Sequence, residues 1–103
     1  MNHPRSRLDG LIHQPVRFSI LAALDAADEV VFGVLRDALG VSDSVLSHQI
    51  SLLEEGGYVR VRKGHVGKRP RTWLSLAPEG RKAFHRHLAA LRQIVAHVPG
   101  ALT

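Results

Sequence analysis

The polar side chains that could do chemistry are concentrated between Ser42 and Ser51, in SDSVLSHQIS. At 3.6 residues per turn, Leu46, Ile50 and Leu53 fall on one side of a helix, and a polar group flanked by Ser47 falls on the other, namely Ser44, His48 and Ser51. Hydroxyl and imidazole groups are short, so they can donate or accept hydrogen bonds close to a surface. This face suits the floor of a DNA groove, although a serine-rich solvent face is the alternative interpretation. The groove-facing set is Ser42, Ser44, Ser47, His48 and Ser51.

A second chemical feature follows between Gly56 and Pro78, where six residues are basic and none is acidic. These six are a large share of the 14 Lys and Arg of the chain. Like charges held this close repel one another, so they favour an anionic partner such as DNA phosphate. The alternative is that they only solvate an exposed hairpin. The six are Arg60, Arg62, Lys63, Lys68, Arg69 and Arg71.

Composition sets the limits within which these features act. The 103 residues are enough for one domain with a modest core. A net charge of +5 favours a polyanion, either nucleic acid or an anionic membrane surface. The absence of Cys excludes disulfides and thiolate metal sites. No apolar run approaches the roughly 18 residues of a membrane span, and the first residues lack the hydrophobic region of a signal peptide. We therefore expect a soluble cytoplasmic protein without a membrane partner.

The sequence contains no set of residues typical of an enzyme. No Gly-rich phosphate loop follows a strand, and no nucleophile motif surrounds any Ser. The neighbouring carboxylates Glu54 and Glu55 fall at the end of a predicted helix and are expected to be solvated. We expect neither enzymatic activity nor a cofactor.

The elements that position the polar face are predicted from hydrophobic periodicity. A first helix is expected at about 15–26, a short extended segment at 29–32 and a second helix at about 33–39. A tight turn at 39–41 leads into the polar helix. Ser42 is a good N-cap for that helix, and Gly56 or Gly57 can supply the left-handed residue that ends it.

After Gly57 the period changes from 3.6 to 2, which predicts a hairpin with strands near 59–62 and 73–76. The connection at 63–71 contains two glycines and a proline, so we expect an exposed loop there, too long for a tight turn. Pro78 then opens a last helix. Its apolar residues follow the 4-3-4-3 spacing of a coiled-coil-like seam.

The order helix, short strand, helix, helix, hairpin and long helix is that of a winged helix-turn-helix. The chain resembles the small MarR/ArsR-type winged-helix transcriptional regulators, in their short single-domain form. The resemblance covers roughly residues 11–92. Ala77 departs from the Thr that usually caps the last helix in these proteins. The matching segments are HQPVRFSILAAL, FGVLRDALGVSDSVLSHQISLLEEGGYV and RPRTWLSLAPEGRKAF.

The resemblance implies a fold that is mainly α with a small β-hairpin wing, followed by a C-terminal dimerisation helix. Residues 1–10 are polar, so we expect them to form a flexible N-terminal arm or the run-in to a helix. Residues 99–103 are expected to form a tail. The winged-helix domain would occupy residues 11–98, with the dimerisation helix at about 79–98.

The same resemblance implies sequence-specific binding of double-stranded DNA by a homodimer on a pseudo-palindromic operator, usually to repress transcription. The groove-facing set would enter the major groove. The six basic residues would be the wing contacts, with Lys68, Arg69 and Arg71 at phosphates or in the minor groove and Arg60 and Arg62 more ambiguous. The apolar seam needs a cover, and a second copy is the expected one. The predicted dimer interface is Leu11, Ile12, Phe84, Leu88, Leu91, Val95 and Val98.

Two other functions stay open at this point, a protein-interaction module and a sequence-independent architectural protein that binds nucleic acid. The basic wing and the serine-lined helix argue against the first, and only a measured specificity ratio separates the second. No residue indicates a particular small-molecule effector.

Several single residues also have competing interpretations. His85 and His87 could suggest the histidine metal sites of some ArsR-type sensors. They are two residues apart, on opposite sides of a helix, so we expect no metal site and a solvated or dimer-rim position. Trp73 is expected half-buried against the last helix, and a platform on which a base stacks is the alternative. Arg17 could approach the DNA backbone or pair with an acidic residue, and the sequence leaves both open.

Overall fold

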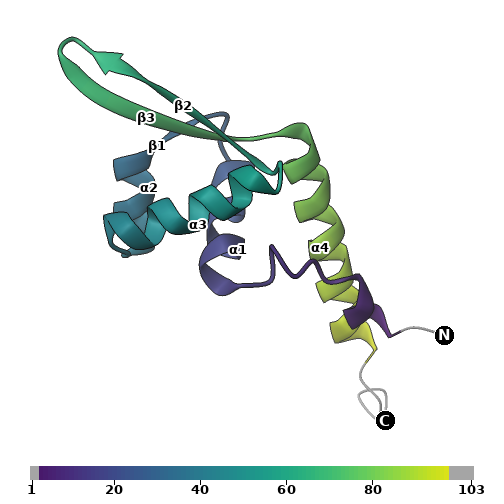
Figure 1. The fold of residues 1–103 in the computed structure, drawn as a ribbon. Helices are drawn as coiled ribbons and strands as arrows, with labels where there is room; N and C mark the ends of the chain where they lie inside the picture. The colour runs from purple at the N-terminus through teal and green to yellow at the C-terminus, as the bar shows by residue number, and fades with distance from the viewer. Residues whose placement is uncertain (1–2, 98–103) are drawn as a thin grey trace.

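The computed structural model describes residues 3–97, and it confirms a mainly helical fold with a small β-hairpin wing. Helices α1, α2 and α3 form a compact group, from which the hairpin projects at one end and α4 at the other (Figure 1). The molecule is correspondingly elongated, with extents of 62 × 25 × 21 Å. The elements are η1 (Pro4–Arg7), α1 (Pro15–Asp25), β1 (Val30–Val31), α2 (Phe32–Leu39), α3 (Asp43–Glu55), β2 (Val59–Val66), β3 (Arg69–Leu76) and α4 (Pro78–Ala96).

The core lies where α1, α2, α3 and the base of the sheet meet. Leu46, Ile50 and Leu53 of α3 are all buried, as their spacing predicted. They share one apolar cluster with residues from α1, α2, β2, β3 and α4. Burial of a stripe on one side of α3 fixes which side is left exposed, because the helix period allows only one arrangement.

Helix α3 is bounded by the signals that the sequence predicted. The hydroxyl of Ser42 accepts a hydrogen bond from the backbone N–H of Val45, with 3.2 Å between the two atoms. After the helix, Gly57 has a φ of 80°, a conformation that side chains with a Cβ rarely adopt. The turn before α3 is held by an ion pair between Arg36 of α2 and Asp43, with a distance of 2.8 Å. The polar helix is thus oriented by caps at both ends.

The sheet has three antiparallel strands in the order β1-β3-β2. Strands β2 and β3 pair continuously from Val59 opposite Leu76 to Val66 opposite Arg69. The prediction of an exposed loop at 63–71 is therefore wrong, because only Gly67 and Lys68 lie outside the ladder. Gly67 has a φ of 62°, which a two-residue hairpin turn requires. The outer half of the hairpin is largely solvent-exposed on both faces. Its strands are held by backbone pairing, so its sequence shows no alternation of apolar and polar residues that would predict a strand.

The N-terminal arm predicted at residues 1–10 contains a short helical element in the part that the structure describes. Residues 4–7 form the 3₁₀ helix η1, which packs against α4. Pro4 is buried, and the side chain of Arg7 donates a hydrogen bond to Gln93. These contacts involve isolated residues without a helical or alternating period, so the sequence contained no pattern that predicts them.

The segment LAPEG, which spans the end of β3 and the first turn of α4, is explained by a close backbone approach. A Cβ placed on Gly80 would lie 2.0 Å from the carbonyl oxygen of Tyr58. The N–H of Ala77 donates to the same carbonyl, with a distance of 3.0 Å. Ala77 makes no side-chain cap, as expected, and Pro78 opens the helix in its place. The start of α4 is therefore fixed against the start of β2.

Candidate nucleic-acid interface

The exposed side of α3 has the composition predicted for it. All five residues of the groove-facing set, Ser42, Ser44, Ser47, His48 and Ser51, are solvent-exposed. Val45 shares this exposure, with 42% of its surface accessible, and the sequence analysis did not include it in the groove-facing set. The helix thus presents hydroxyls, an imidazole and one branched apolar side chain to the solvent.

Strand register divides the basic residues of the hairpin between two faces. Arg60, Arg62, Arg69 and Arg71 lie on one face, because they alternate along the strands and sit opposite Ser75, Trp73, Val66 and Gly64 respectively. Lys63 lies on the other face, opposite Thr72. Lys68 is in the turn. The six charges therefore do not form one continuous cluster.

Arg62 differs from the other hairpin arginines because its guanidinium is already engaged. It forms two hydrogen bonds to the carboxylate of Glu29, with distances of 2.7 and 3.2 Å. Its central carbon also lies 4.0 Å from the centroid of the Trp73 ring. The bond to Glu29 raises the pKa of Arg62 above its ordinary value. Arg62 therefore joins the hairpin to the segment before β1. Its position in a run of basic residues gave no indication of this role in the sequence.

Trp73 lies in β3, opposite Arg62 of β2 and Val31 of β1. A Cβ added to Gly64 would be 3.1 Å from the indole ring, so the ring covers the backbone of β2. The ring is partly exposed. We predicted that Trp73 packs against the last helix. The structure instead places its ring beneath the guanidinium of Arg62.

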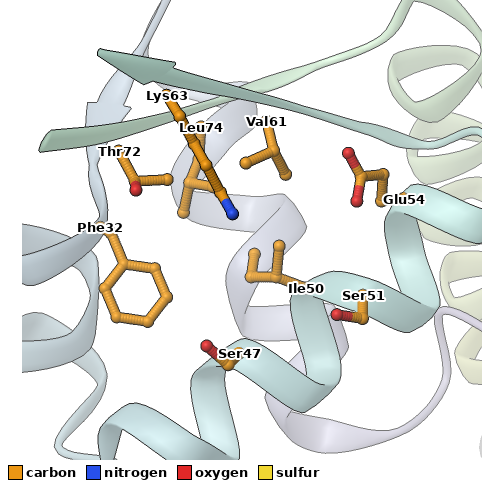
Figure 2. Close-up of a pocket in the computed structure, with 9 residues that line it drawn as sticks. All are labelled: Phe32, Ser47, Ile50, Ser51, Glu54, Val61, Lys63, Thr72 and Leu74. Carbon is orange, nitrogen blue, oxygen red and sulfur yellow. The ribbon is translucent and has the colours of Figure 1, made fainter.

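A pocket of about 290 Å³ separates α3 from the inner face of the hairpin. We call it the α3–hairpin notch; Figure 2 shows that its lining comes from α3 on one side and from the strands and Phe32 on the other. Lys63 extends from β2 into it, with its amine directed toward α3 (Figure 2). The notch is lined by Phe32, Ser47, Ile50, Ser51, Glu54, Val61, Lys63, Thr72 and Leu74.

Within residues 3–97, Arg17 forms no ion pair with an acidic residue, which was one of the two roles left open for it. Its guanidinium donates to the backbone carbonyl of Leu11 and, at 2.7 Å, to the side-chain oxygen of Gln49 in α3. Arg17 therefore ties α1 to the preceding segment and to the inner edge of α3.

His87 is buried rather than solvated, with 1% of its surface exposed, which corrects its predicted position. Its Nδ1 accepts a hydrogen bond of 3.0 Å from the backbone N–H of Asp9. The carboxylate of Asp9 in turn accepts a bond of 2.6 Å from the hydroxyl of Tyr58. Burial, and next the nearby His13, lower the pKa of His87, whereas Asp9 opposes the shift. The imidazole is thus a neutral acceptor that holds the N-terminal segment on α4.

The other histidine of this pair, His85, lies on the far side of α4 and contacts Asp25 at 3.0 Å. Arg81 also pairs with Asp25, at 2.7 Å. Across residues 3–97, no three His, Asp or Glu side chains are grouped as a metal site would need. In the same range, no helix is both long and apolar enough to cross a membrane.

The predicted dimer residues occupy three kinds of position. Ile12 and Phe84 are buried in the chain's own core, so neither is available to a second chain. Phe84 packs there against Phe18 of α1, with 5.5 Å between ring centroids. Leu11, Leu88 and Leu91 are half-buried, and Val95 is 73% exposed. Val98 lies outside the described residues.

Comparison with known proteins identifies a matching protein family and a relative of similar sequence. The model of a family described as a winged helix DNA-binding domain matches residues 16–95. An uncharacterized protein of Methanocaldococcus jannaschii is 28% identical over 88 residues, which are 85% of this chain and 96% of that protein.

Two solved structures share the fold. A transcriptional regulator homologue from Pyrococcus horikoshii superposes with a TM-score of 0.84 at 24% identity, covering 93% of this chain and 96% of that one. The M. tuberculosis transcriptional regulator MOSR in complex with DNA superposes with a TM-score of 0.71 at 21% identity, covering 95% and 70% respectively.

Proposed function

The chain belongs to the family of winged helix DNA-binding domains, and from this premise we propose that it is a transcriptional regulator that recognises a specific double-stranded DNA sequence. The observation that supports this most is the exposed polar face of α3 beside a basic hairpin. A helix fits the major groove, and hydroxyl and imidazole groups can bond base edges or nearby phosphates. Such a protein would act on chromosomal DNA in the cytoplasm.

In this proposal the exposed groups have different tasks. Ser44, His48 and Ser51 lie opposite the buried stripe of α3 and would read base edges. Lys68 and Arg69, at the turn end of the hairpin, would bind phosphates or enter the minor groove, whose negative potential attracts Arg. Arg62 would act indirectly, because Glu29 and Trp73 already engage it.

We further propose that the protein works as a homodimeric repressor on a pseudo-palindromic operator. The side of α4 that carries the half-buried Leu88 and Leu91 and the exposed Val95 is an apolar surface that a second copy would cover. Two copies related by a twofold axis would place their α3 helices about one DNA turn apart, roughly 34–36 Å. Occupation of a promoter by such a dimer would block transcription.

The dimer is tested by sedimentation of the full chain and of Val95→Glu. Val95 is exposed, so the charge is expected to leave the fold intact and to shift the protein to monomer. Arg92→Glu, at an exposed position on the same helix, is the control for added negative charge. A wild-type protein that sediments as a stable monomer would contradict the dimer.

DNA recognition is tested by a binding assay at fixed salt with the DNA upstream of the protein's own gene. A scrambled duplex of equal length serves as competitor. We expect specific binding at least about 10³-fold tighter than non-specific binding. Equal removal by the scrambled duplex would favour the architectural protein, and absence of DNA binding would favour the protein-interaction module.

A further inference from the structure

The α3–hairpin notch lies between the two elements that the proposed function assigns to different grooves. If α3 enters the major groove and the hairpin reaches the adjacent minor groove, one sugar-phosphate strand must pass between them, because one strand separates neighbouring grooves of B-DNA. The notch is the space that α3 and the hairpin leave for that strand (Figure 2).

The polar lining of the notch fits a phosphate group. Lys63 extends its amine into the space from β2, and the hydroxyls of Ser47 and Thr72 line the opposite sides (Figure 2). Lysine, serine and threonine side chains are common donors to DNA phosphates. Within residues 3–97, no ion pair joins Lys63 to another side chain, although Glu54 lines the same notch. The charge of Lys63 is therefore available to an external anion.

The floor of the notch is apolar and would contact the sugar. Ile50, Val61 and Leu74 lie between the polar groups, and the ring of Phe32 closes one side. A deoxyribose presents carbon atoms next to its phosphate, so a mixed lining matches a backbone unit better than it matches a free ion. Glu54, near the end of α3, is the one anionic group in the lining and would limit how tightly the strand is held.

We propose that the α3–hairpin notch binds one phosphodiester of the DNA strand between the two grooves, with Lys63 as its cationic ligand and Ser47 and Thr72 as hydroxyl donors. The proposal rests on the proposed function and deepens it. Lys63 then sets the depth at which α3 enters the major groove, whereas the hairpin arginines lie on the opposite face of the sheet from the notch.

The test uses the full chain and a duplex that the wild-type protein binds, with each phosphate replaced in turn by an uncharged methylphosphonate. Wild-type protein is expected to lose about tenfold in affinity at one phosphate at the boundary of the two grooves. Lys63→Ala should weaken binding to the unmodified duplex by a similar factor and lose nothing further at that phosphate. It should also reduce the slope of log K against log salt by about one unit.

Two variants serve as controls. Lys68→Ala, at the hairpin turn, should lose sensitivity at a different phosphate. Glu54→Gln should strengthen binding, since it removes a negative charge beside the strand. Both positions are exposed, as is Lys63, so we expect the three substitutions to leave the fold intact. Unchanged thermal unfolding of the variants will show this.

The outcomes separate this proposal from the proposed function. If Lys63→Ala and every single methylphosphonate have additive effects, DNA binding stands and the notch does not hold a phosphate. If the wild-type protein binds no duplex at all, the proposed function fails and the notch proposal fails with it.

Discussion

The guanidinium of Arg62 lies over the ring of Trp73, with 4.0 Å between the central carbon and the ring centroid, while it also bonds to Glu29. The two partners come from different parts of the chain, the paired strand β3 and the segment before β1. Arg62 thereby connects the hairpin to the helical body. An arginine held in this way orients the hairpin instead of supplying a free charge to DNA.

Replacement of Arg62 by alanine is therefore expected to weaken DNA binding while leaving the salt slope almost unchanged. Arg69→Ala, the matched control near the turn, should flatten the slope by about one unit, because it removes a phosphate contact. Since Trp73 is the single tryptophan, its fluorescence will report the lost stacking directly. A full unit of slope lost in Arg62→Ala would show that Arg62 binds a phosphate after all.

Reading of bases is expected to depend on His48. His48→Ala should change the preference among DNA sequences, with a loss of about 1–3 kcal/mol of discrimination at the contacted base pair. Arg69→Ala should instead weaken binding to all sequences alike. Selection from randomised duplexes measures both effects. Identical changes in the two variants would contradict the division between α3 and the hairpin.

Gly80→Ala is expected to destabilise the protein by about 3 kcal/mol, because the new Cβ would lie 2.0 Å from the carbonyl oxygen of Tyr58. Gly33→Ala in α2 is the control, since its Cβ would meet only Arg36 at 3.6 Å. That change should stabilise the helix by about 0.5–1 kcal/mol. Denaturant unfolding of the two variants measures the contrast, and equal effects would argue against the close approach of α4 to Tyr58.

Stability is expected to fall on acidification because of His87. Burial lowers its pKa in the folded protein, so the unfolded chain binds the proton more readily. The contribution is fully present above the unfolded value of about 6.5 and is lost as the pH falls through the lower folded pKa. Protonation would also remove the Nδ1 acceptor for the N–H of Asp9.

The measurement is the free energy of unfolding between pH 8 and pH 5 for the wild type and for His87→Asn. Asparagine can supply an acceptor near the position of Nδ1 but cannot titrate. Its pH dependence should be shallower by up to about 1.4 kcal/mol per pH unit over that window. His13 and Asp9 face the same site, so only the difference between the two proteins is assigned to His87. Parallel curves would remove His87 as the cause.

The helical part of the fold followed from local rules. Leu46, Ile50 and Leu53 determined the buried side of α3, and Ser42 and Gly57 determined its ends. Exposure of the groove-facing set followed from the same period, because the side of a helix opposite its buried apolar stripe faces the solvent. The resemblance in the helix-turn-helix and at LAPEGR indicated the family that the winged helix model matches.

The N-terminal segment needed the tertiary structure. Asp9, Tyr58 and His87 are far apart in the sequence and meet through single hydrogen bonds, which leave no periodic signal. The local sequence of an amphipathic helix does not determine whether a histidine on it is buried or solvated. Its position was decided by the polar partner that η1 and the following turn place beside it.

Strand register decided the rest of the candidate site. The sequence determined that six basic residues gather in the hairpin. Because both faces of the ladder are exposed, basic residues can occupy either face, and their spacing does not indicate which one. Pairing of Arg62 with Trp73 and of Lys63 with Thr72 placed neighbouring cations on opposite faces. One of them then meets Glu29 and the other enters the α3–hairpin notch. Adjacent residues in a strand point to opposite sides, so only the packed sheet could determine which charge faces α3.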